Sequence, residues 1–587
     1  MRTFIKFCVV LTVFLEPIGF ACQRETSRNV KNIETFARLY GYARWFHPSD
    51  EAQQIDWDKF AVLGIQKIEN IKSSEELQGT LFQLFSPIVQ GLQIYETGKP
   101  ERFNSDILLS PDKNAKPVAW QHYGVYLNDK SNVYKSVRTN KNNFTGKMFD
   151  RMPQFGEIIK EPIGSNLTCV IPLVLLTNDT ATYPKSETTS FIRLKSEIDK
   201  ININNEFNMQ VNLASVVVAW NVLQHFFPYF DVIDTDWNKV LGETLKSALE
   251  NKRKKDYFVT MSQMFAKIDD GHGIVYGEQM YHLPIRTEFI ENKIVITASN
   301  DTLLKRGDII KKMDGKSVMA VLDEKEKIIS GSPQLRRHRA LNILGSKFDS
   351  GETHLVIERD GKKQNITVQN SSRGSMFFNP IDDRKYLSET IVEIEPSIYY
   401  INMTNCTEND FYKKIDVLAN AKAVIYDQRG GSRLQFFYIV PYLIKEPVTS
   451  TWWNIPQTIY PDRKEVEFNK SKWDIQPKQP LFKSKTIIIN VPSVVSSGET
   501  MMGIIDHYKL ATTVGETTAG CNGNINTIKL PYGYFAWFTG MKVLKHDGSQ
   551  LYKVGFQPDY PVNKTIQAVK EGRDEYLEKA LEIARHE

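Results

Sequence analysis

The segment around Ser496 constrains the fold more than any other part of the chain, because it joins a buried apolar run to a helical pattern. Residues 486–490 (Thr-Ile-Ile-Ile-Asn) have the continuous apolar character of a buried strand, and residues 500–508 have the spacing of a helix. Between them lies Ser496-Ser-Gly-Glu499. A Ser at such a turn exposes its hydroxyl beside free backbone N–H groups, as a serine nucleophile requires. Ser and Gly are also ordinary N-cap and turn residues, so both interpretations stay open on these four residues alone.

Length and composition limit the class of protein. A chain of 587 residues is too long for one hydrophobic core and predicts several domains. The net charge of +5 is small, and basic residues alternate with acidic ones, which does not indicate nucleic acid or an anionic membrane as a partner. The sequence has no Cys-x-x-Cys, no His-Glu-x-x-His and no Gly-rich phosphate loop, so it predicts neither a metal site nor a cofactor.

The N-terminus has the pattern of an export signal. Arg2 and Lys6 precede the apolar residues 7–14, and small residues lead to Cys22. We therefore expect residues 1–22 to be a signal peptide and the mature chain to reach the bacterial periplasm or cell envelope. The residues before Cys22 partly match a lipoprotein box, so a lipid anchor on Cys22 is the alternative to a freely released chain. No later segment has the roughly 20 continuous apolar residues that cross a bilayer.

A weak internal duplication relates two parts of the N-terminal half. Asp56-Trp57 recurs as Asp236-Trp237, 180 positions later, and further identities follow at the same offset. Apolar residues at helical spacing predict two copies of one helical module. The first belongs to an N-terminal domain over residues 23–205, together with a β-rich segment of unassigned role. The second forms a helical cap over residues 206–283, in which His272 stands where the first copy has Leu92.

Two further domains follow. Over residues 284–371, short strands surround Arg306-Gly-Asp-Ile-Ile310, a pattern similar to the middle of a PDZ domain, a small β-fold that accepts a peptide as an added strand. Over residues 390–587, strands alternate with helices, which predicts a sheet with crossover helices and with ligand sites at the strand ends. One strand, residues 423–426, leads into the turn Asp427-Gln-Arg-Gly-Gly431.

Four residues carry chemistry suited to acyl transfer. Ser496 is the candidate nucleophile, and His272 is a base that changes protonation near neutral pH. The backbone N–H groups of Gly430 and Ser497 are candidates for an oxyanion hole. Each has a structural alternative, since a Gly-flanked His or a Gly pair after a strand is commonly only a turn.

The ordered set of motifs resembles the tail-specific, or C-terminal-processing, serine peptidase family, and within it the branch of the tricorn core and the interphotoreceptor retinoid-binding protein. The resemblance covers about residues 208–565 and implies a helical cap, a PDZ domain and a crotonase-like β/α core. It implies Ser496 as the nucleophile, three residues before the Glu of the family's Ser-x-x-Glu motif. The motifs are Asp269-Asp-Gly-His-Gly273, Arg306-Gly-Asp-Ile-Ile310, Tyr426-Asp-Gln-Arg-Gly-Gly431, Ser496-Ser-Gly-Glu499, Val514-Gly-Glu-Thr-Thr-Ala-Gly520 and Val554-Gly-Phe-Gln-Pro-Asp559.

The same resemblance identifies a candidate base but no orienting acid. The processing-peptidase branch uses a Lys where this chain has Cys521, whereas the tricorn-like branch uses a His that matches His272. That branch also has an orienting acid near the closing motif, at a position that holds Tyr552 here. Gln550 or Asp547 are the other candidates for this orienting role. Nothing in the sequence lowers the pKa of Cys521, which disfavours it as a nucleophile.

The sequence therefore predicts an α+β multidomain protein that is an exported serine endopeptidase with peptide or protein substrates. The alternative is a catalytically weak or inactive protein that binds peptides or hydrophobic ligands on the same fold, and Tyr552 in place of an acid favours it. An esterase is less favoured because Gly-x-Ser-x-Gly is absent around Ser496. The aromatic residues Trp452, Trp453, Phe535, Trp537 and Phe538 are candidates for lining an apolar cleft. The sequence does not indicate an oligomeric state.

Overall fold

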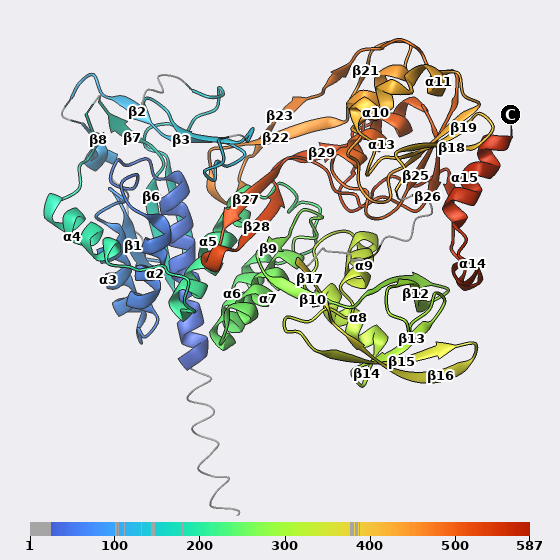
Figure 1. Cartoon of the computed structure of the whole chain (residues 1–587). Coiled ribbons are helices and arrows are strands. Elements are labelled where there is room, and N and C mark those ends of the chain that lie inside the picture. Colours follow the sequence, from blue (N-terminus) through green and yellow to red (C-terminus); the bar gives the residue numbers. More distant parts are fainter. Residues whose placement is uncertain are drawn as a thin grey trace, which may run out of the picture.

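The computed structural model describes residues 25–586 except 100–102, 104, 111, 131, 142–146, 179, 376–380, 382–385 and 387. The predicted signal peptide and Cys22 lie outside the described residues. Within the described residues, no helix combines the length and the apolar character needed to cross a bilayer. The chain has a mixed α/β multidomain architecture (Figure 1).

The C-terminal region is built on a six-stranded sheet in the order β18-β19-β20-β25-β26-β30. Its strands are parallel except for the antiparallel pair β18 and β19. The apolar run predicted to be a buried strand is β25, and it is buried on both faces: Ile487 and Ile489 pack with α15, while Ile488 packs with α13. The elements are β18 (Ile391–Glu395), β19 (Ile398–Asn402), α10 (Glu408–Lys413), α11 (Ile415–Ala419), β20 (Ala423–Asp427), α12 (Phe436–Ile439), β25 (Lys485–Asn490), α13 (Ser497–Tyr508), β26 (Thr512–Gly515), β30 (Tyr560–Pro561), α14 (Ile566–Glu571) and α15 (Glu575–Arg585).

Two helical groups follow the internal duplication. The second and third helices of each group begin at positions 180 apart, and Asp56 and Asp236 each accept a hydrogen bond from the backbone at the start of the second helix. The groups pack against each other, and Asn221 Nδ2 donates to Ala37 O at 2.9 Å. The first group is a helix over residues 25–46, α2 (Trp57–Ile68) and α3 (Ser74–Phe85), and the second is α5 (Met209–Phe226), α6 (Trp237–Glu250) and α7 (Lys254–Ala266).

The β-rich segment of unassigned role contributes strands to a sheet shared with the C-terminal region. β3 and β4 join β22 and β23 in the order β23-β22-β3-β4, and β29 also pairs with β22. A separate sheet of three strands has the order β1-β6-β5. The strands are β1 (Gln93–Glu96), β3 (Trp120–Tyr123), β4 (Lys135–Arg138), β5 (Ile158–Gly164), β6 (Leu167–Pro172), β22 (Trp452–Thr458), β23 (Glu467–Ser471) and β29 (Lys542–Leu544).

Residues 284–371 form an antiparallel sheet with two helices. Five strands follow the order β11-β12-β13-β15-β16, with β14 paired to β13. The likeness of this unit to a PDZ domain, and that of the C-terminal sheet to a crotonase fold, stay predictions. The elements are β11 (Ile285–Ile290), β12 (Lys293–Ser299), β13 (Ile309–Met313), β14 (Lys316–Ser317), α8 (Val318–Glu326), α9 (Pro333–Asn342), β15 (Glu352–Arg359) and β16 (Lys362–Gln369).

A small antiparallel sheet brings the second helical group to the C-terminal region. β9 (Val275–Tyr276) pairs with β28 (Phe535–Thr539), which pairs with β27 (Ile525–Lys529), so segments distant in sequence lie side by side at the centre of the molecule (Figure 1). The loop between α7 and β9 carries His272 and is thereby placed near the ends of the strands of the C-terminal sheet.

Candidate active site

Ser496 lies at a strained turn between strand β25 and helix α13. Its backbone has φ 56° and ψ −117°, a conformation unfavourable for a residue with a Cβ. Two hydrogen bonds hold it there: Ser496 N donates to Cys521 O at 2.8 Å, and Thr500 N donates to Ser496 O at 3.0 Å. The side chain is half-buried and lines a cavity. Backbone strain that is held in place at a residue whose hydroxyl lines a cavity is typical of a functional residue.

Glu499 ties helix α13 to the loop that holds Ser496. Its buried carboxylate accepts hydrogen bonds from Gly520 N at 2.5 Å, Thr518 Oγ1 at 3.0 Å and Cys521 N at 3.4 Å. Burial raises the pKa of Glu499 to about 8, although these donors act in the opposite direction. Since Cys521 O in turn accepts from Ser496 N, the Glu of the Ser-x-x-Glu segment holds the turn in place. From the sequence, Glu499 was known only as the Glu of the motif that locates Ser496, and its structural role was not predicted.

The loop that carries His272 is fixed from two sides. Asp269, at φ 52°, forms ion pairs with Arg336 of α9 and with Lys553, whose Nζ lies 2.6 Å from its carboxylate. Arg339 of α9 donates to Gly271 O at 2.6 Å. Helix α9 of the 284–371 unit therefore holds the loop beside the C-terminal region.

Gly271 allows this loop to approach the loop of Cys521. A Cβ at position 271 would lie 2.6 Å from Cys521 Cβ and 2.7 Å from its Sγ, closer than carbon and sulfur atoms can pack. The glycine next to the candidate base is thus required by a close approach.

His272 is oriented by Thr539 and Asp270. Thr539 Oγ1 donates to Asp270 Oδ1 at 2.8 Å and lies 2.9 Å from His272 Nδ1. With its proton on Asp270, this oxygen accepts from Nδ1–H, which leaves the lone pair of His272 on Nε2. Burial lowers the pKa of His272, and the nearby Asp270 carboxylate opposes that effect. Thr539 was missed by the sequence analysis, and Asp270 was noted only as part of a motif.

Tyr552 and Gln550, the residues predicted to orient the site, make hydrogen bonds or bridges to groups other than His272. The Tyr552 hydroxyl donates to Ile268 O, and its ring stacks on Tyr229 with centroids 3.9 Å apart. Gln550 bridges to Leu544 through the backbone. Within the described part of the chain, no hydrogen bond joins Tyr552 or Gln550 to His272. An orienting role for them stays a prediction. Thr539 contacts the imidazole of His272 directly, and Asp270 contacts Thr539.

The two predicted oxyanion donors lie on neighbouring turns. β20 and β25 are adjacent parallel strands, so the turn containing Gly430 and the turn containing Ser496 are at the same edge of the sheet. Ser493 Oγ donates to Arg429 O at 3.1 Å and joins these turns. Within the described residues, the N–H groups of Gly430 and Ser497 have no protein acceptor. Ser497 lines the cavity, whereas Gly430 is not among its lining residues.

Ser496 and His272 line the same cavity, which has a volume of about 540 Å³. Of the aromatic residues predicted to line a cleft, Trp453 and Trp537 do so, whereas Trp452, Phe535 and Phe538 are not among the lining residues. The polar residues Arg339, Gln435, Asn522 and Asn524 also line the cavity, and its aromatic lining residues are Tyr276, Phe436, Phe437, Trp453, Trp473 and Trp537.

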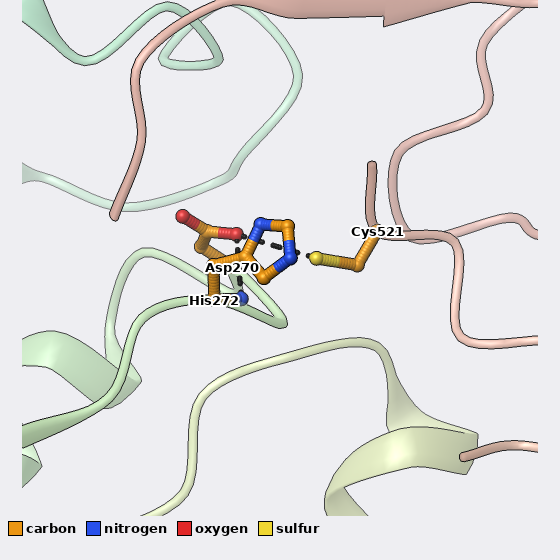
Figure 2. A group of neighbouring side chains, drawn as sticks. All are labelled: Asp270, His272 and Cys521. Atoms are coloured by element: carbon orange, nitrogen blue, oxygen red, sulfur yellow. Dashed lines mark hydrogen bonds between the residues drawn. The ribbon is translucent and has the colours of Figure 1, made fainter. Parts of the chain in front are cut away.

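Cys521 lies beside His272 but has the properties of a neutral thiol. Its Sγ is buried and donates to Asp270 Oδ1 at 3.7 Å (Figure 2). Burial raises the pKa of Cys521 well above its ordinary value, and Asp270 adds to the effect. A protonated thiol is a poor nucleophile, which agrees with the preference for Ser496.

Comparison with known proteins gives a match for the C-terminal region. Residues 397–562 match the model of Peptidase family S41. Comparison with curated protein sequences returned no match. Among solved structures, mature CPAF superposes with a TM-score of 0.53 at 14% identity, over 64% of this chain and 96% of that chain. Mature CPAF complexed with lactacystin gives a TM-score of 0.54 at 14% identity, over 64% and 97%. At this identity the similarity concerns the fold.

Proposed function

We propose that this chain, whose residues 397–562 match the model of Peptidase family S41, is a serine-type peptidase, and more specifically an exported serine endopeptidase with Ser496 as nucleophile and His272 as general base. The resemblance to tail-specific peptidases is confirmed at the level of the family. Membership of the tricorn-like branch stays a prediction. A peptidase of this family acts on peptides or proteins, and a substrate in extended form fits an open cavity beside Ser496.

In the proposed reaction, Ser496 Oγ attacks the carbonyl carbon of the scissile bond and passes its proton to His272 Nε2. The Ser497 and Gly430 N–H groups stabilise the negative charge that develops on the substrate oxygen, and the N-terminus of α13 adds its dipole. The imidazolium then gives its proton to the leaving amine, and water hydrolyses the acyl-enzyme with His272 again as base. Thr539 and Asp270 keep Nδ1–H engaged throughout, and the Asp270 carboxylate stabilises the imidazolium.

The observation that carries the proposal is the juxtaposition of a strained, hydroxyl-bearing turn and a histidine of fixed tautomer in the wall of one cavity. Ser496, from the turn before α13, and His272, from the loop before β9, reach this cavity from separate segments. The helical cap, PDZ-like and crotonase-like assignments belong to the same proposal, as does export to the periplasm or cell envelope with or without a lipid on Cys22.

Hydrolysis of an unfolded protein substrate tests the proposal. We expect Ser496→Ala to lower kcat by about 10⁴-fold or more, because the nucleophile is lost. Ser497→Ala is the matched control: it keeps the backbone N–H and we expect it to retain kcat within about tenfold of the wild type.

Two results would contradict this assignment. Loss of activity in Ser497→Ala alone would move the nucleophile by one residue. A folded wild type that hydrolyses nothing would favour the alternative, an inactive protein that binds peptides or hydrophobic ligands in the aromatic cavity.

A further inference from the structure

A buried cluster of three metal-ligating side chains lies beside the proposed nucleophile. One ligand atom each from Asp270, His272 and Cys521 lies within 4.8 Å of the others, and all three residues are buried. Figure 2 shows the carboxylate, the imidazole and the thiol close together, with a hydrogen bond drawn directly from Cys521 to Asp270. We propose that these three residues bind a Zn²⁺ ion that inhibits the peptidase; the inhibition, but not the binding, rests on the proposed function.

The ligands are held in place before any ion binds. The Asp270 carboxylate accepts from Thr539 N at 2.5 Å, Thr539 Oγ1 at 2.8 Å and His272 N at 2.9 Å. The contact of Gly271 with Cys521 keeps the two loops together, and Asp270 Oδ1 and Cys521 Sγ lie 3.7 Å apart. Binding an ion therefore requires small movements of side chains and little ordering of the backbone.

The donor set selects the metal. A thiolate, an imidazole nitrogen and a carboxylate oxygen are ligands that Zn²⁺ accepts, whereas Mg²⁺ and Ca²⁺ prefer oxygen alone. Zn–S, Zn–N and Zn–O bonds of about 2.0–2.3 Å place two ligands of one ion about 3.3–3.8 Å apart in a tetrahedron. Asp270 Oδ1 and Cys521 Sγ already lie 3.7 Å apart, and the three ligand atoms lie within 4.8 Å of one another, so the ligand atoms move closer together when an ion binds. Since His272 also lines the cavity, a fourth position faces the space beside Ser496 and is open to water.

Binding would block the proposed reaction at the base. The nitrogen that Thr539 does not occupy, His272 Nε2, would be a zinc ligand and could not take the proton of Ser496. As the Zn–S bond forms, the S–H bond of Cys521 breaks and its proton goes to solvent, so no oxidant or other reactant is needed. Cys521, at the position that holds Lys in the processing-peptidase branch, would thus be a ligand of an inhibitory zinc ion.

Zinc titration of the full chain tests the site without using activity. Isothermal calorimetry on Ser496→Ala, which does not digest itself, should give one Zn²⁺ per chain with a Kd of about 1 µM or tighter. Cys521→Ala in the same background should weaken binding by at least about tenfold. The matched control is Cys406→Ala, another buried free cysteine, and its affinity should equal that of the parent.

Co²⁺ is a second probe that needs no Cys521 variant, so it remains informative should that variant fail to fold. A thiolate-to-cobalt charge-transfer band should appear in the near ultraviolet with the parent chain. The proposed site would be overturned by the absence of that band. It would also be overturned if 100 µM Zn²⁺, in about tenfold molar excess over the protein, did not bind, or if Cys521→Ala bound zinc as tightly as the parent.

The inhibition is measured separately. Peptide hydrolysis by the wild type should fall at least about tenfold in saturating Zn²⁺ and return with a chelator. Within Cys521→Ala, the ratio of activities with and without Zn²⁺ should approach one. Zinc binding in a chain that has no peptidase activity would sustain the site and refute the proposed function. Zinc binding with unchanged peptidase activity would overturn the inhibitory role.

Discussion

At the scale of single residues, the candidate base depends on a threonine hydroxyl. Thr539 stands between His272 and Asp270, at 2.9 Å from the imidazole nitrogen and 2.8 Å from the carboxylate. No acidic side chain contacts His272 Nδ1 in the described hydrogen bonds, so the hydroxyl transmits the effect of Asp270. Thr539 is thus a candidate for the orienting group, and the orienting role predicted for Tyr552 stays a prediction.

Thr539→Val removes this hydroxyl and keeps the shape of the side chain. We expect kcat to fall by about 10- to 100-fold with little change in KM, because the tautomer and orientation of His272 are no longer fixed. Thr539→Ser, which retains the hydroxyl, should recover most of kcat. Steady-state kinetics on one fluorogenic peptide compares the three proteins, and a valine variant as active as the wild type would refute the role of Thr539.

At the scale of elements, the turn from β25 into α13 is stabilised by a residue of α13 itself. Glu499, in the first turn of α13, binds the loop 518–521, and that loop binds Ser496 N. The strained backbone of Ser496 therefore persists because a buried carboxylate satisfies three donors that would otherwise have no acceptor.

Glu499→Ala should lower the free energy of unfolding by about 2–4 kcal/mol, because Gly520 N and Thr518 Oγ1 lose their acceptor inside the protein. Glu582→Ala, at an exposed position of α15, is the control and should change it by less than about 0.5 kcal/mol. Urea denaturation gives both values. Equal stability of the Glu499 variant and the control would show that the carboxylate does not hold the turn.

Much of this local architecture was predictable from sequence, and the contacts that complete the site were not. The apolar run 486–490 lies in β25, and the predicted helix 500–508 lies within α13, because local apolar patterns report burial. The offset of 180 likewise marks equivalent helix starts. Thr539 and Cys521, however, meet Asp270 from positions 269 and 251 residues away, and β3 pairs with β22 across an even larger separation. Periodicity carries no information on such long-range contacts.

At the scale of the whole molecule, the 284–371 unit is joined to the C-terminal region by an ion-pair network. Lys564 Nζ lies 2.6 Å from Glu288 Oε2 on β11, and Arg286 Nε lies 3.6 Å from Glu288 Oε1. Burial alone would raise the pKa of Glu288, but Lys564 and Arg286 outweigh it and hold the pKa at about 2. The charge of this carboxylate therefore contributes to the attachment of the unit.

The pH dependence of stability follows from this lowered pKa. The contribution of Glu288 is complete above its unfolded-state pKa of 4.5 and is lost as the pH falls from there toward 2. We expect the wild type to lose stability on acidification over that window, and Glu288→Gln to lose less while being less stable at pH 7. Urea midpoints at several pH values measure this. Parallel pH profiles for the two proteins would show that Glu288 is not the titrating group.

The central claim is that Ser496 is a nucleophile activated by His272, and labelling with a fluorophosphonate probe tests it most directly. The wild type, Ser496→Ala, Ser497→Ala and His272→Ala are treated with the probe, and the labelled peptide is identified by mass spectrometry. The account predicts labelling at Ser496 in the wild type and in Ser497→Ala, none in Ser496→Ala, and a rate about 100-fold or more lower in His272→Ala. Labelling at Ser497, or a folded wild type that is never labelled, would contradict it.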